Sequence, residues 1–269
     1  MHICNVSRPD VAYAVCCLAR FSKTAGESHV KALLRVVAYL YHTRYLGITY
    51  YRDIPRENVF HGMERNVPRV YETGVHPCDV NKKNPVKVFV DSDFAGNDGR
   101  STAGHVVFLN GGPVIWSSKL MKVAATSSSE AEIIAAVEAV KTSIHFRNLL
   151  EELGLYSEEH IDIYEDNQSC KMSAESLKQH KKARHYQAKL RFLQDTYQAG
   201  IIRFHQTGTE DEIADIFTKG LPSDSHWKHT DTMLKELPEH VIASSEAAEA
   251  SSSVNVPEEE KHDGVLLFE

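Results

Sequence analysis

The chain has 269 residues, of which 42% are hydrophobic and 25% charged, a balance typical of a globular protein with a sizeable core. No apolar run reaches the roughly 18 residues that a membrane-spanning helix needs, and the N-terminus lacks the apolar core of a secretory signal. The five cysteines form no CxxC pair, which argues against a zinc site or a disulfide framework. We therefore expect an intracellular, cytoplasmic protein that is not secreted and has no membrane partner.

The net charge of −7 is unevenly distributed along the chain. Seven acids and one lysine lie between Ser244 and Glu269, so this tail carries −6 and leaves −1 for all preceding residues. The acidic average therefore does not exclude a nucleic-acid partner for the body of the chain.

Residues 1–52 predict a small satellite of two helices and a short strand. Residues 11–21 and 29–47 carry apolar residues at helical spacing, and Asp10 is the expected N-cap of the first helix. Residues 48–51 predict the short strand.

Two segments lack a clear period. Residues 53–84 contain three prolines in a polar stretch, which predicts a loop or linker. Residues 223–269 are polar and acidic, and we expect their end to be disordered.

Residues 85–222 predict an α/β domain with the element order βββαβαβα. Strands are expected at 86–90, 105–110, 113–118, 161–164 and 201–205, and helices at 127–154, 183–199 and 211–220. Gly111 and Gly112 predict a hairpin turn between the second and third strands. A three-strand meander followed by right-handed crossovers gives a mixed five-stranded sheet with helices on both faces.

Four acids lie at or near the ends of these elements. Asp91 ends the first strand and Asp166 follows the fourth, so the two converge if these strands are neighbours. Glu132, near the start of the long helix, and Asp215, in the last helix, can complete the cluster. Converging carboxylates repel one another unless cations such as Mg²⁺ neutralise them. The competing interpretation is that these acids are solvated or cap helices, with Glu132 pairing with Ser129 in a capping box.

Four strings occur in this block in a fixed order: VFVDSDFAGNDGRSTAGHVVFLNGGPVIWSSK, TSSSEAEIIAAVEA, IYEDNQSC and EIADIFTKGLP. Together they closely resemble the ribonuclease H (RNase H) domain of copia-type (Ty1/copia) retrotransposon Pol polyproteins. The upstream strings SRPDVAYAVCCLARF and HVKALLRVVAYLYHTRYLG resemble the C-terminal end of the reverse transcriptase in the same polyproteins. The resemblance assigns residues 1–52 to a reverse-transcriptase remnant and residues 85–222 to an RNase H-like domain.

This resemblance implies an RNase H-like fold and a specific reaction. The RNA strand of an RNA–DNA hybrid is hydrolysed with two Mg²⁺ ions, for which Mn²⁺ can substitute. The acids of the family motifs, which are catalytic and bind the metals, correspond to Asp91, Glu132, Asp166 and Asp215. The neighbouring acids Asp93 and Glu130 are expected to be solvated instead.

The chain departs from the family pattern close to the expected site. Where the family has a KHIDIRYHFIR-like string, this chain has RHYQAKLRFLQ: His185 is kept, but Gln187 and Arg191 replace an aspartate and a histidine. KGLP replaces KPLP, and Glu165 replaces the usual cysteine, which adds a negative charge beside Asp166. These departures concern substrate handling more than metal binding.

Several polar and basic residues are expected to bind the substrate. Residues 171–191 contain seven bases and one acid, a basic stripe that suits phosphate contacts; its alternative is a solvated helix face. The expected nucleic-acid contacts are Ser92, Asn167, Gln168, Lys181, Lys182, Arg184 and His185. Asn167 and Gln168 follow Asp166 at an expected helix start, where capping is their alternative role.

Two further residues have a structural and a functional interpretation. His205 lies ten residues before Asp215 and is a candidate for assisting product release, as a histidine before the last acid does in some related enzymes. Its alternative is a plain strand residue. Trp116 ends a strand and is expected in the core rather than as a base-stacking platform.

We predict an endonuclease that acts on RNA–DNA hybrids, with the upstream reverse transcriptase as a second partner. The chain contains no YVDD-type polymerase motif, so we expect no DNA synthesis. One alternative is a catalytically silent remnant that binds nucleic acid or a polymerase partner. Another is a DDE-type transposase or integrase domain, which shares the fold. The glutamate early in the first long helix and the aspartate, rather than glutamate, in the last helix argue against it.

Overall fold

The computed structural model describes residues 2–50, 86–96, 99–155, 160–176 and 186–237. The predicted 53–84 linker and the predicted disordered end of the tail lie outside these residues. The chain divides into two compact units, residues 1–235 and 236–269. Domain boundaries at 52, 84 and 222 stay predictions. No helix in the described ranges is long and apolar enough to cross a membrane.

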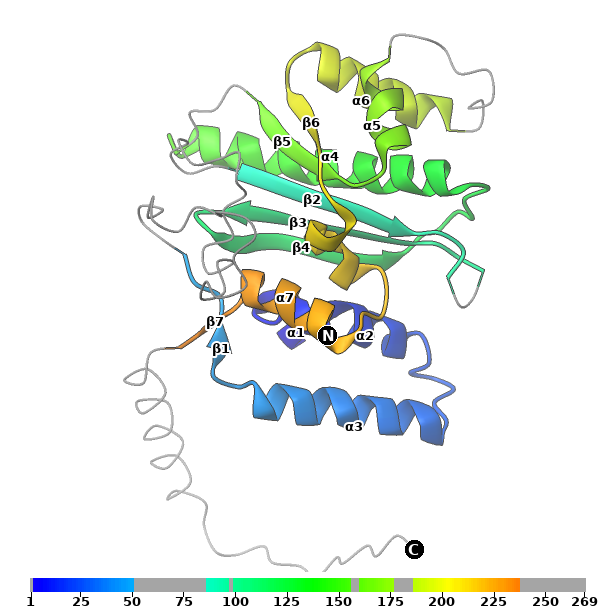
Figure 1. Ribbon diagram of the computed structural model, residues 1–269, viewed down its shortest axis with the longest axis vertical. Helices are drawn as coiled ribbons and strands as arrows, with labels where there is room; N and C mark the ends of the chain where they lie inside the picture. Colours follow the sequence, from blue (N-terminus) through cyan, green and yellow to red (C-terminus); the bar gives the residue numbers. More distant parts are fainter. Residues whose placement is uncertain (1, 51–85, 97–98, 156–159, 177–185, 238–269) are drawn as a thin grey trace, which may run out of the picture. The chain divides into compact units, whose positions relative to one another are not determined.

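A mixed five-stranded sheet forms the centre of the first unit (Figure 1). Its strands are β2 (Val86–Asp93), β3 (Thr102–Leu109), β4 (Gly112–Leu120), β5 (Ile161–Glu165) and β6 (Ile202–Gln206). Their order in space is β4-β3-β2-β5-β6. Strand β3 pairs antiparallel with β2 and β4, whereas β5 pairs in parallel with β2 and β6. The α/β class and the mixed five-stranded sheet predicted from the sequence are confirmed.

The hairpin between β3 and β4 turns at Asn110 and Gly111, whose φ angles of 51° and 82° lie in the left-handed region. Two successive left-handed residues characterise the type I′ hairpin turn, which favours Asn-Gly. The turn predicted at Gly111 and Gly112 is therefore one residue too late, because Gly112 already opens β4.

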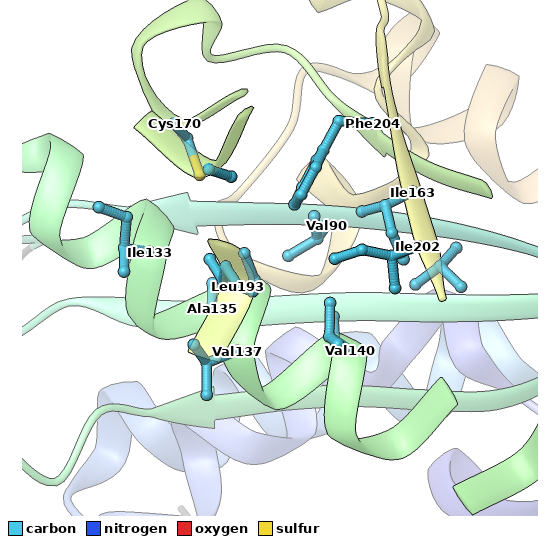
Figure 2. Packing of buried hydrophobic residues seen from close by; sticks show 14 of the residues in the cluster. Val90, Ile133, Ala135, Val137, Val140, Ile163, Cys170, Leu193, Ile202 and Phe204 are labelled. Carbon is cyan, nitrogen blue, oxygen red and sulfur yellow. The ribbon is translucent and has the colours of Figure 1, made fainter. Parts of the chain in front are cut away.

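One face of the sheet is covered by helices that include α4, which contacts β2 and β3 (Figure 1). The helices on this face are α4 (Ser128–Glu152), α5 (Gln168–Glu175) and α6 (Gln187–Gln198). Ala135 and Ala139 of α4 are buried, and their small side chains let the helix approach the sheet closely. Figure 2 shows Val90 and Ile163 of the sheet in one core with Val140 of α4. Burial of this apolar surface stabilises the sheet and fixes the position of α4 on it.

The other face of the sheet carries aromatic side chains. Phe89 stacks on Tyr164 with ring centroids 4.8 Å apart and meets Phe108 edge-on at 5.8 Å. Three short elements follow β6: η6 (Thr209–Asp211), η7 (Ile213–Phe217) and α7 (Ser223–Met233). Of these, η7 packs on β2 and β3, and α7 packs on η7.

These short elements differ from the sequence interpretation. In place of the single helix predicted at 211–220, the structure has the five-residue 3-10 helix η7, and η6 ends before it at Asp211. Glu212 separates the two with an extended backbone and caps η7 with its side chain. Helix α7 occupies the start of the segment that was interpreted as a polar tail. It forms there because Met233 and Leu234 are buried in the aromatic face's core, although most of its other residues are polar.

The N-terminal segment also packs against the aromatic face. Its elements are α1 (His2–Val6), η1 (Pro9–Val11), α2 (Ala12–Ala19), α3 (Glu27–His42) and β1 (Leu46–Gly47). A second two-residue strand is β7 (Lys235–Glu236). Trp116 of β4 donates a hydrogen bond from Nε1 to the carbonyl oxygen of Cys4 at 2.6 Å, so this tryptophan ties the segment to the sheet.

A buried ion pair organises the N-terminal helices. Nη2 of Arg8 lies 2.6 Å from Oδ2 of Asp10 and donates to Oγ1 of Thr43 at 2.6 Å. The hydroxyl of Tyr39 donates to Asp10 at 2.8 Å. The predicted N-cap role of Asp10 is therefore wrong: its carboxylate binds Arg8, and α2 is preceded by Val11 without a side-chain cap.

Candidate functional site

The sheet itself brings two of the expected acids together. Strands β2 and β5 are parallel neighbours, with Phe89 opposite Tyr164. Continuing this register by two residues sets Asp91 opposite Asp166. In β2, Asp91 shares the face of Phe89 because alternate residues of a strand point to the same side. It therefore lies on the face that η7 covers.

A glycine on β3 allows η7 to approach Asp91. Gly104 is the β3 partner of Asp91. A Cβ atom on Gly104 would lie 2.6 Å from Cγ2 of Thr218 and 2.7 Å from Cβ of Phe217, closer than real contacts permit. The bare backbone leaves room for Thr218, whose hydroxyl donates a hydrogen bond to Oδ2 of Asp91. Asp215 precedes Thr218 in η7, so this packing places a third acid at the same end of the sheet.

Lys219 supplies a positive charge to this group. Its Nζ lies 2.7 Å from Oδ1 of Asp215 and 3.9 Å from Oδ2 of Asp91. Although burial disfavours the charged ammonium, the carboxylates of Asp91, Asp215 and Asp166 together raise the pKa of Lys219. Lys219 therefore stays protonated and partly neutralises the acids.

Glu132 approaches the cluster from α4. Burial, together with the charges of Asp91 and Asp166, raises the pKa of Glu132 to about 9. Ser92, which is buried next to Asp91 in β2, opposes this rise. Oε2 of Glu132 is buried and has no hydrogen-bond partner within the described part of the chain. Glu132 is thus a carboxyl group held in an environment that favours its neutral form.

The capping interpretation of Glu132 is wrong. A capping box with Glu132 requires Ser129 as the N-cap of α4. The N-cap is instead Ser127, two residues earlier, and its side chain accepts a hydrogen bond from the backbone N–H of Glu130. Glu130 completes the cap by accepting hydrogen bonds from the N–H and hydroxyl of Thr126, both at 2.7 Å. Since Glu130 holds the helix terminus, the carboxylate of Glu132 is not used there.

The remaining expected acids have perturbed pKa values as well. Burial and then the charge of Asp91 raise the pKa of Asp215 to about 7. The same two causes raise the pKa of Asp166, whose side chain also accepts a hydrogen bond from Thr209. Asp93 is expected from the sequence to be solvated. In the structure, burial and then the charge of Asp91 raise its pKa as well.

Two further acids lie in the same group, and both have an exposed fraction of 0%. Glu165 accepts a hydrogen bond from the N–H of Asn167, and Glu212 accepts one from the N–H of Ala214. Burial raises the pKa values of both acids. The charges of Glu132 and Glu212 raise the pKa of Glu165 further, and the charge of Asp91 raises that of Glu212 further. In the sequence, Glu165 stands out only as a departure from the family pattern, and no motif singles out Glu212. Its position just before a buried apolar run at 213–217 is the signal of an N-cap that could have revealed it.

The expected nucleic-acid contacts fall into two groups. Asn167 is the N-cap of α5, and its Oδ1 accepts hydrogen bonds from the N–H groups of Ser169 and Cys170 at 2.9 and 3.2 Å. Gln168 is exposed in the first turn of α5. The expected contacts Lys181, Lys182, Arg184 and His185 lie outside the described residues.

His205 is held in β6 by a neighbouring strand. Its Nε2 lies 2.6 Å from Oδ1 of Asp162, and its ring stacks on Tyr164 with centroids 5.1 Å apart. Trp116 is partly buried and packs on the aromatic face's core, where its indole binds the Cys4 carbonyl.

Several known proteins are similar to this chain in sequence. No family model matches the chain. It is 27% identical over 224 residues to the retrovirus-related Pol polyprotein from transposon TNT 1-94 of Nicotiana tabacum, covering 82% of this chain. It is 29% identical over 219 residues to the Pol polyprotein from transposon RE1 of Arabidopsis thaliana, covering 80% of this chain. The chain spans only 15% and 13% of the length of these two relatives.

A shorter relative and two solved structures complete the comparison. The secreted RxLR effector protein 161 of Plasmopara viticola is 32% identical over 146 residues, which are 54% of this chain and 83% of that protein. The structure of LC11-RNase H1 is 18% identical with a TM-score of 0.40, covering 51% of this chain and 94% of its own. The N-terminal RNase H domain of rv2228c from Mycobacterium tuberculosis is 13% identical with a TM-score of 0.39, covering 56% and 99%.

The strand order and pairing of the sheet, with helices on both sides, define an α/β protein with a mixed five-stranded sheet. The sequence relatives specify it further. The chain is similar over 80–82% of its length to retrovirus-related Pol polyproteins from transposons, in line with the resemblance found in the sequence.

Proposed function

We propose that this chain hydrolyses the RNA strand of RNA–DNA hybrids with the help of divalent cations. The observation that carries the proposal is the cluster of Asp91, Glu132, Asp166 and Asp215 at one end of the sheet. Burial and mutual repulsion raise the pKa values of three of these acids. Carboxylates kept together against their repulsion are a feature of functional sites.

The donor chemistry of the cluster suits Mg²⁺. Every acid in it offers carboxylate oxygens, the ligands that Mg²⁺ prefers, and Oε2 of Glu132 is a buried oxygen without a hydrogen-bond partner among the described residues. Within the described ranges, no three His, Cys, Asp or Glu side chains are placed as a group that could hold a metal ion. Lys219 pairs with Asp91 and Asp215. A metal cation bound by these acids would replace the positive charge that Lys219 now supplies. We infer that Asp91, Glu132, Asp166 and Asp215 hold the metal.

Two residues beside the acids, Thr218 and Lys219, have specific tasks in this proposal. Two Mg²⁺ ions held by these acids, or Mn²⁺ in their place, would activate a water molecule and stabilise the leaving oxygen. Thr218 fixes one oxygen of Asp91 by its hydrogen bond, so the other oxygen remains available. Lys219, with a side chain that is 38% exposed, can leave the acids and contact a substrate phosphate.

Substrate recognition would use the residues around α5. Gln168 is exposed beside Asp166 and can reach a 2′-hydroxyl or a phosphate, whereas Asn167 acts by holding the start of α5 in place. We also propose phosphate contacts for Lys181, Lys182, Arg184 and His185. This part of the proposal rests only on the charge of their side chains. A role of His205 in product release requires that its ring leave Asp162.

A second candidate function is a catalytically silent remnant that binds nucleic acid or a polymerase partner. The pairing of Lys219 with two of the four acids favours it, as do the additional buried acids Glu165 and Glu212. This candidate predicts binding of hybrids without metal-dependent cleavage.

Cleavage of a labelled RNA–DNA hybrid tests the proposal. The purified chain is incubated with Mg²⁺ or Mn²⁺ beside Asp91→Asn, and Asp224→Asn, an exposed aspartate of α7, is the matched control. We expect cleavage of the RNA strand by the parent and by Asp224→Asn, and loss of at least about a hundredfold in Asp91→Asn. Hybrid binding without cleavage by the parent supports the silent remnant. Equal cleavage by the parent and Asp91→Asn contradicts the proposed site.

A further inference from the structure

Asp166 lies just beyond the end of β5, whose last residue is Glu165, so strand pairing alone does not fix its carboxylate. Two residues that follow in the chain contact it. Nε2 of Gln206, at the end of β6, donates a hydrogen bond to the backbone carbonyl oxygen of Asp166. Thr209, the first residue of η6, donates a hydrogen bond to the Asp166 side chain. The direction of this carboxylate therefore depends on where η6 lies.

Helix η6 is too small to hold its own position. It consists of three exposed residues, and its N-cap Gly208 provides no side-chain hydrogen bond. Its backbone hydrogen bond runs from the N–H of Asp211 to the carbonyl oxygen of Gly208 at 2.9 Å. A single 3-10 turn has poor hydrogen-bond geometry and little intrinsic stability. Contacts from outside the turn must therefore keep it in place.

Lys228 of α7 provides such contacts at the end of η6. Its Nζ donates to the carbonyl oxygen of Glu210 at 2.6 Å and lies 2.9 Å from Oδ1 of Asp211. The carbonyl groups at the end of a helix lack partners within the helix, and a lysine is a favourable donor to them. The lysine side chain is only 27% exposed, so it is more restrained than a typical surface lysine.

Helix α7 is a firm base for this lysine. Met233 and Leu234 are buried in the core of the aromatic face. Nε2 of His226 lies 3.2 Å from the carbonyl oxygen of Asp10, and the His226 ring meets the ring of Tyr39 edge-on with centroids 5.6 Å apart. Contacts with both the sheet and the N-terminal segment therefore fix α7, and Lys228 extends from it to η6.

We propose that Lys228 is a positioning residue for Asp166, because it clamps η6 to α7 and so keeps Thr209 on the Asp166 carboxylate. This role rests on the proposed function, in which Asp166 holds a metal ion. Partners that orient metal ligands affect metal affinity and activity although they do not touch the metal. The competing interpretations are an exposed ion pair with Asp211 that has little effect, and a direct contact between Lys228 and a substrate phosphate.

Nuclear magnetic resonance on the metal-free chain tests the clamp without activity. In Lys228→Met, we expect the backbone order parameters of η6 to fall from about 0.85 to below about 0.6. The amide resonances of Asp166 and Asn167 should shift in the same direction as in Thr209→Val. The matched control is Lys31→Met, which breaks the exposed pair of Lys31 and Glu27 at 2.6 Å in α3 and should change neither observable. Both lysine variants should melt within about 3 °C of the parent.

A double-mutant cycle tests whether Lys228 acts through Thr209. With cleavage of a labelled RNA–DNA hybrid as the assay, the Mg²⁺ concentration for half-maximal rate should rise at least about threefold in Lys228→Met and in Thr209→Val. The double variant should need no more Mg²⁺ than Thr209→Val alone, because both substitutions remove the same hydrogen bond to Asp166. The KM for the hybrid should stay within about twofold of the parent value. Lys228→Arg, which keeps a cationic donor, should restore most of the loss.

The two experiments separate this inference from the proposed hydrolysis. A parent that does not cleave hybrids contradicts the hydrolysis, whereas the resonance measurements need neither metal nor substrate and still decide the role of Lys228. Order parameters and resonances in Lys228→Met that match those of Lys31→Met show that Lys228 does not hold η6 and overturn the inference. Additive effects of Lys228→Met and Thr209→Val, or a raised KM with an unchanged Mg²⁺ requirement, also overturn it, since Lys228 then acts elsewhere.

Discussion

Two groups of buried charges in this chain are built in opposite ways. In the N-terminal segment, Arg8 and Asp10 neutralise each other, and neighbouring hydroxyl groups complete their hydrogen bonds. At the end of the sheet, acids face acids, and Lys219 pairs with two of them. The first group holds helices together, whereas the second keeps a repulsion that the rest of the fold must outweigh. The difference separates a structural ion pair from the acid cluster for which we propose a cation site.

The largest effect is expected from breaking the satisfied pair. Arg8→Ala leaves Asp10 buried without its cation and should lower the free energy of unfolding by about 3–5 kcal/mol. Urea denaturation measures this loss. The double variant Arg8→Met with Asp10→Leu should recover most of it, because no unpaired charge remains. A loss below about 1 kcal/mol in Arg8→Ala would mean that this buried ion pair stabilises the fold no more than an exposed ion pair does, and would contradict its structural role.

The acid cluster should respond to pH in the opposite sense to an ordinary salt-bridged acid. The pKa of Asp215 is raised to about 7 and that of Glu132 to about 9. Their contribution to stability is therefore full below pH about 4 and is lost as pH rises through about 7 and about 9. Without divalent cations, we expect the free energy of unfolding to fall by at least about 2 kcal/mol between pH about 5.5 and about 8.5, the part that Asp215 alone contributes below pH about 7. Asp91→Asn should flatten this profile, and an equally steep fall in that variant contradicts the assigned repulsion.

The approach of η7 to the acids depends on Gly104. Gly104→Ala introduces a Cβ at 2.6 Å from Thr218 and 2.7 Å from Phe217, so the unfolding free energy should fall by about 1–3 kcal/mol. Gly208→Ala is the matched control, because its Cβ meets only Asp211 Oδ2 at an ordinary 3.7 Å. Thermal melts distinguish the two. Equal melting temperatures would mean that η7 is not held against β3 as described.

The smallest effect is expected at Lys219. Lys219→Met removes a cation from the cluster and should destabilise the metal-free chain by about 1 kcal/mol at pH about 8, since the side chain is partly exposed. Mg²⁺ should restore this loss, because it replaces the missing positive charge. Lys122→Met, an exposed lysine outside the cluster, should show neither change.

The sequence predicts the parts of this arrangement that follow from local pattern. Runs of apolar residues identify the strands, and the sequence sets Asp91 and Asp166 near strand ends. That these strands are neighbours is left open by the sequence and is shown by the pairing of β2 with β5. The predicted metal-binding and substrate-binding roles of these residues stay predictions. The resemblance of ordered motifs predicts the similarity to transposon Pol polyproteins that the curated relatives show.

Other features depend on tertiary contacts and could not be derived in this way. Three serines precede Glu130, and only packing of α4 on the sheet selects Ser127 as the cap and leaves Glu132 to the cluster. Helix α7 has a polar sequence, yet Met233 and Leu234 anchor it on the aromatic face. Glu212 joins the acids because η7 folds back over β3, a contact between segments more than a hundred residues apart.

Binding of Mg²⁺ tests the central claim, that repelling acids are kept together to hold a cation. Isothermal calorimetry at pH about 7.5, with thermal melts over the same Mg²⁺ range, compares the parent with Asp91→Asn and Asp224→Asn. We expect saturable binding and a rising melting temperature for the parent and Asp224→Asn, and at least about tenfold weaker binding for Asp91→Asn. A folded parent that shows neither heat nor stabilisation with Mg²⁺ or Mn²⁺, or an Asp91→Asn variant that binds equally well, would contradict the account.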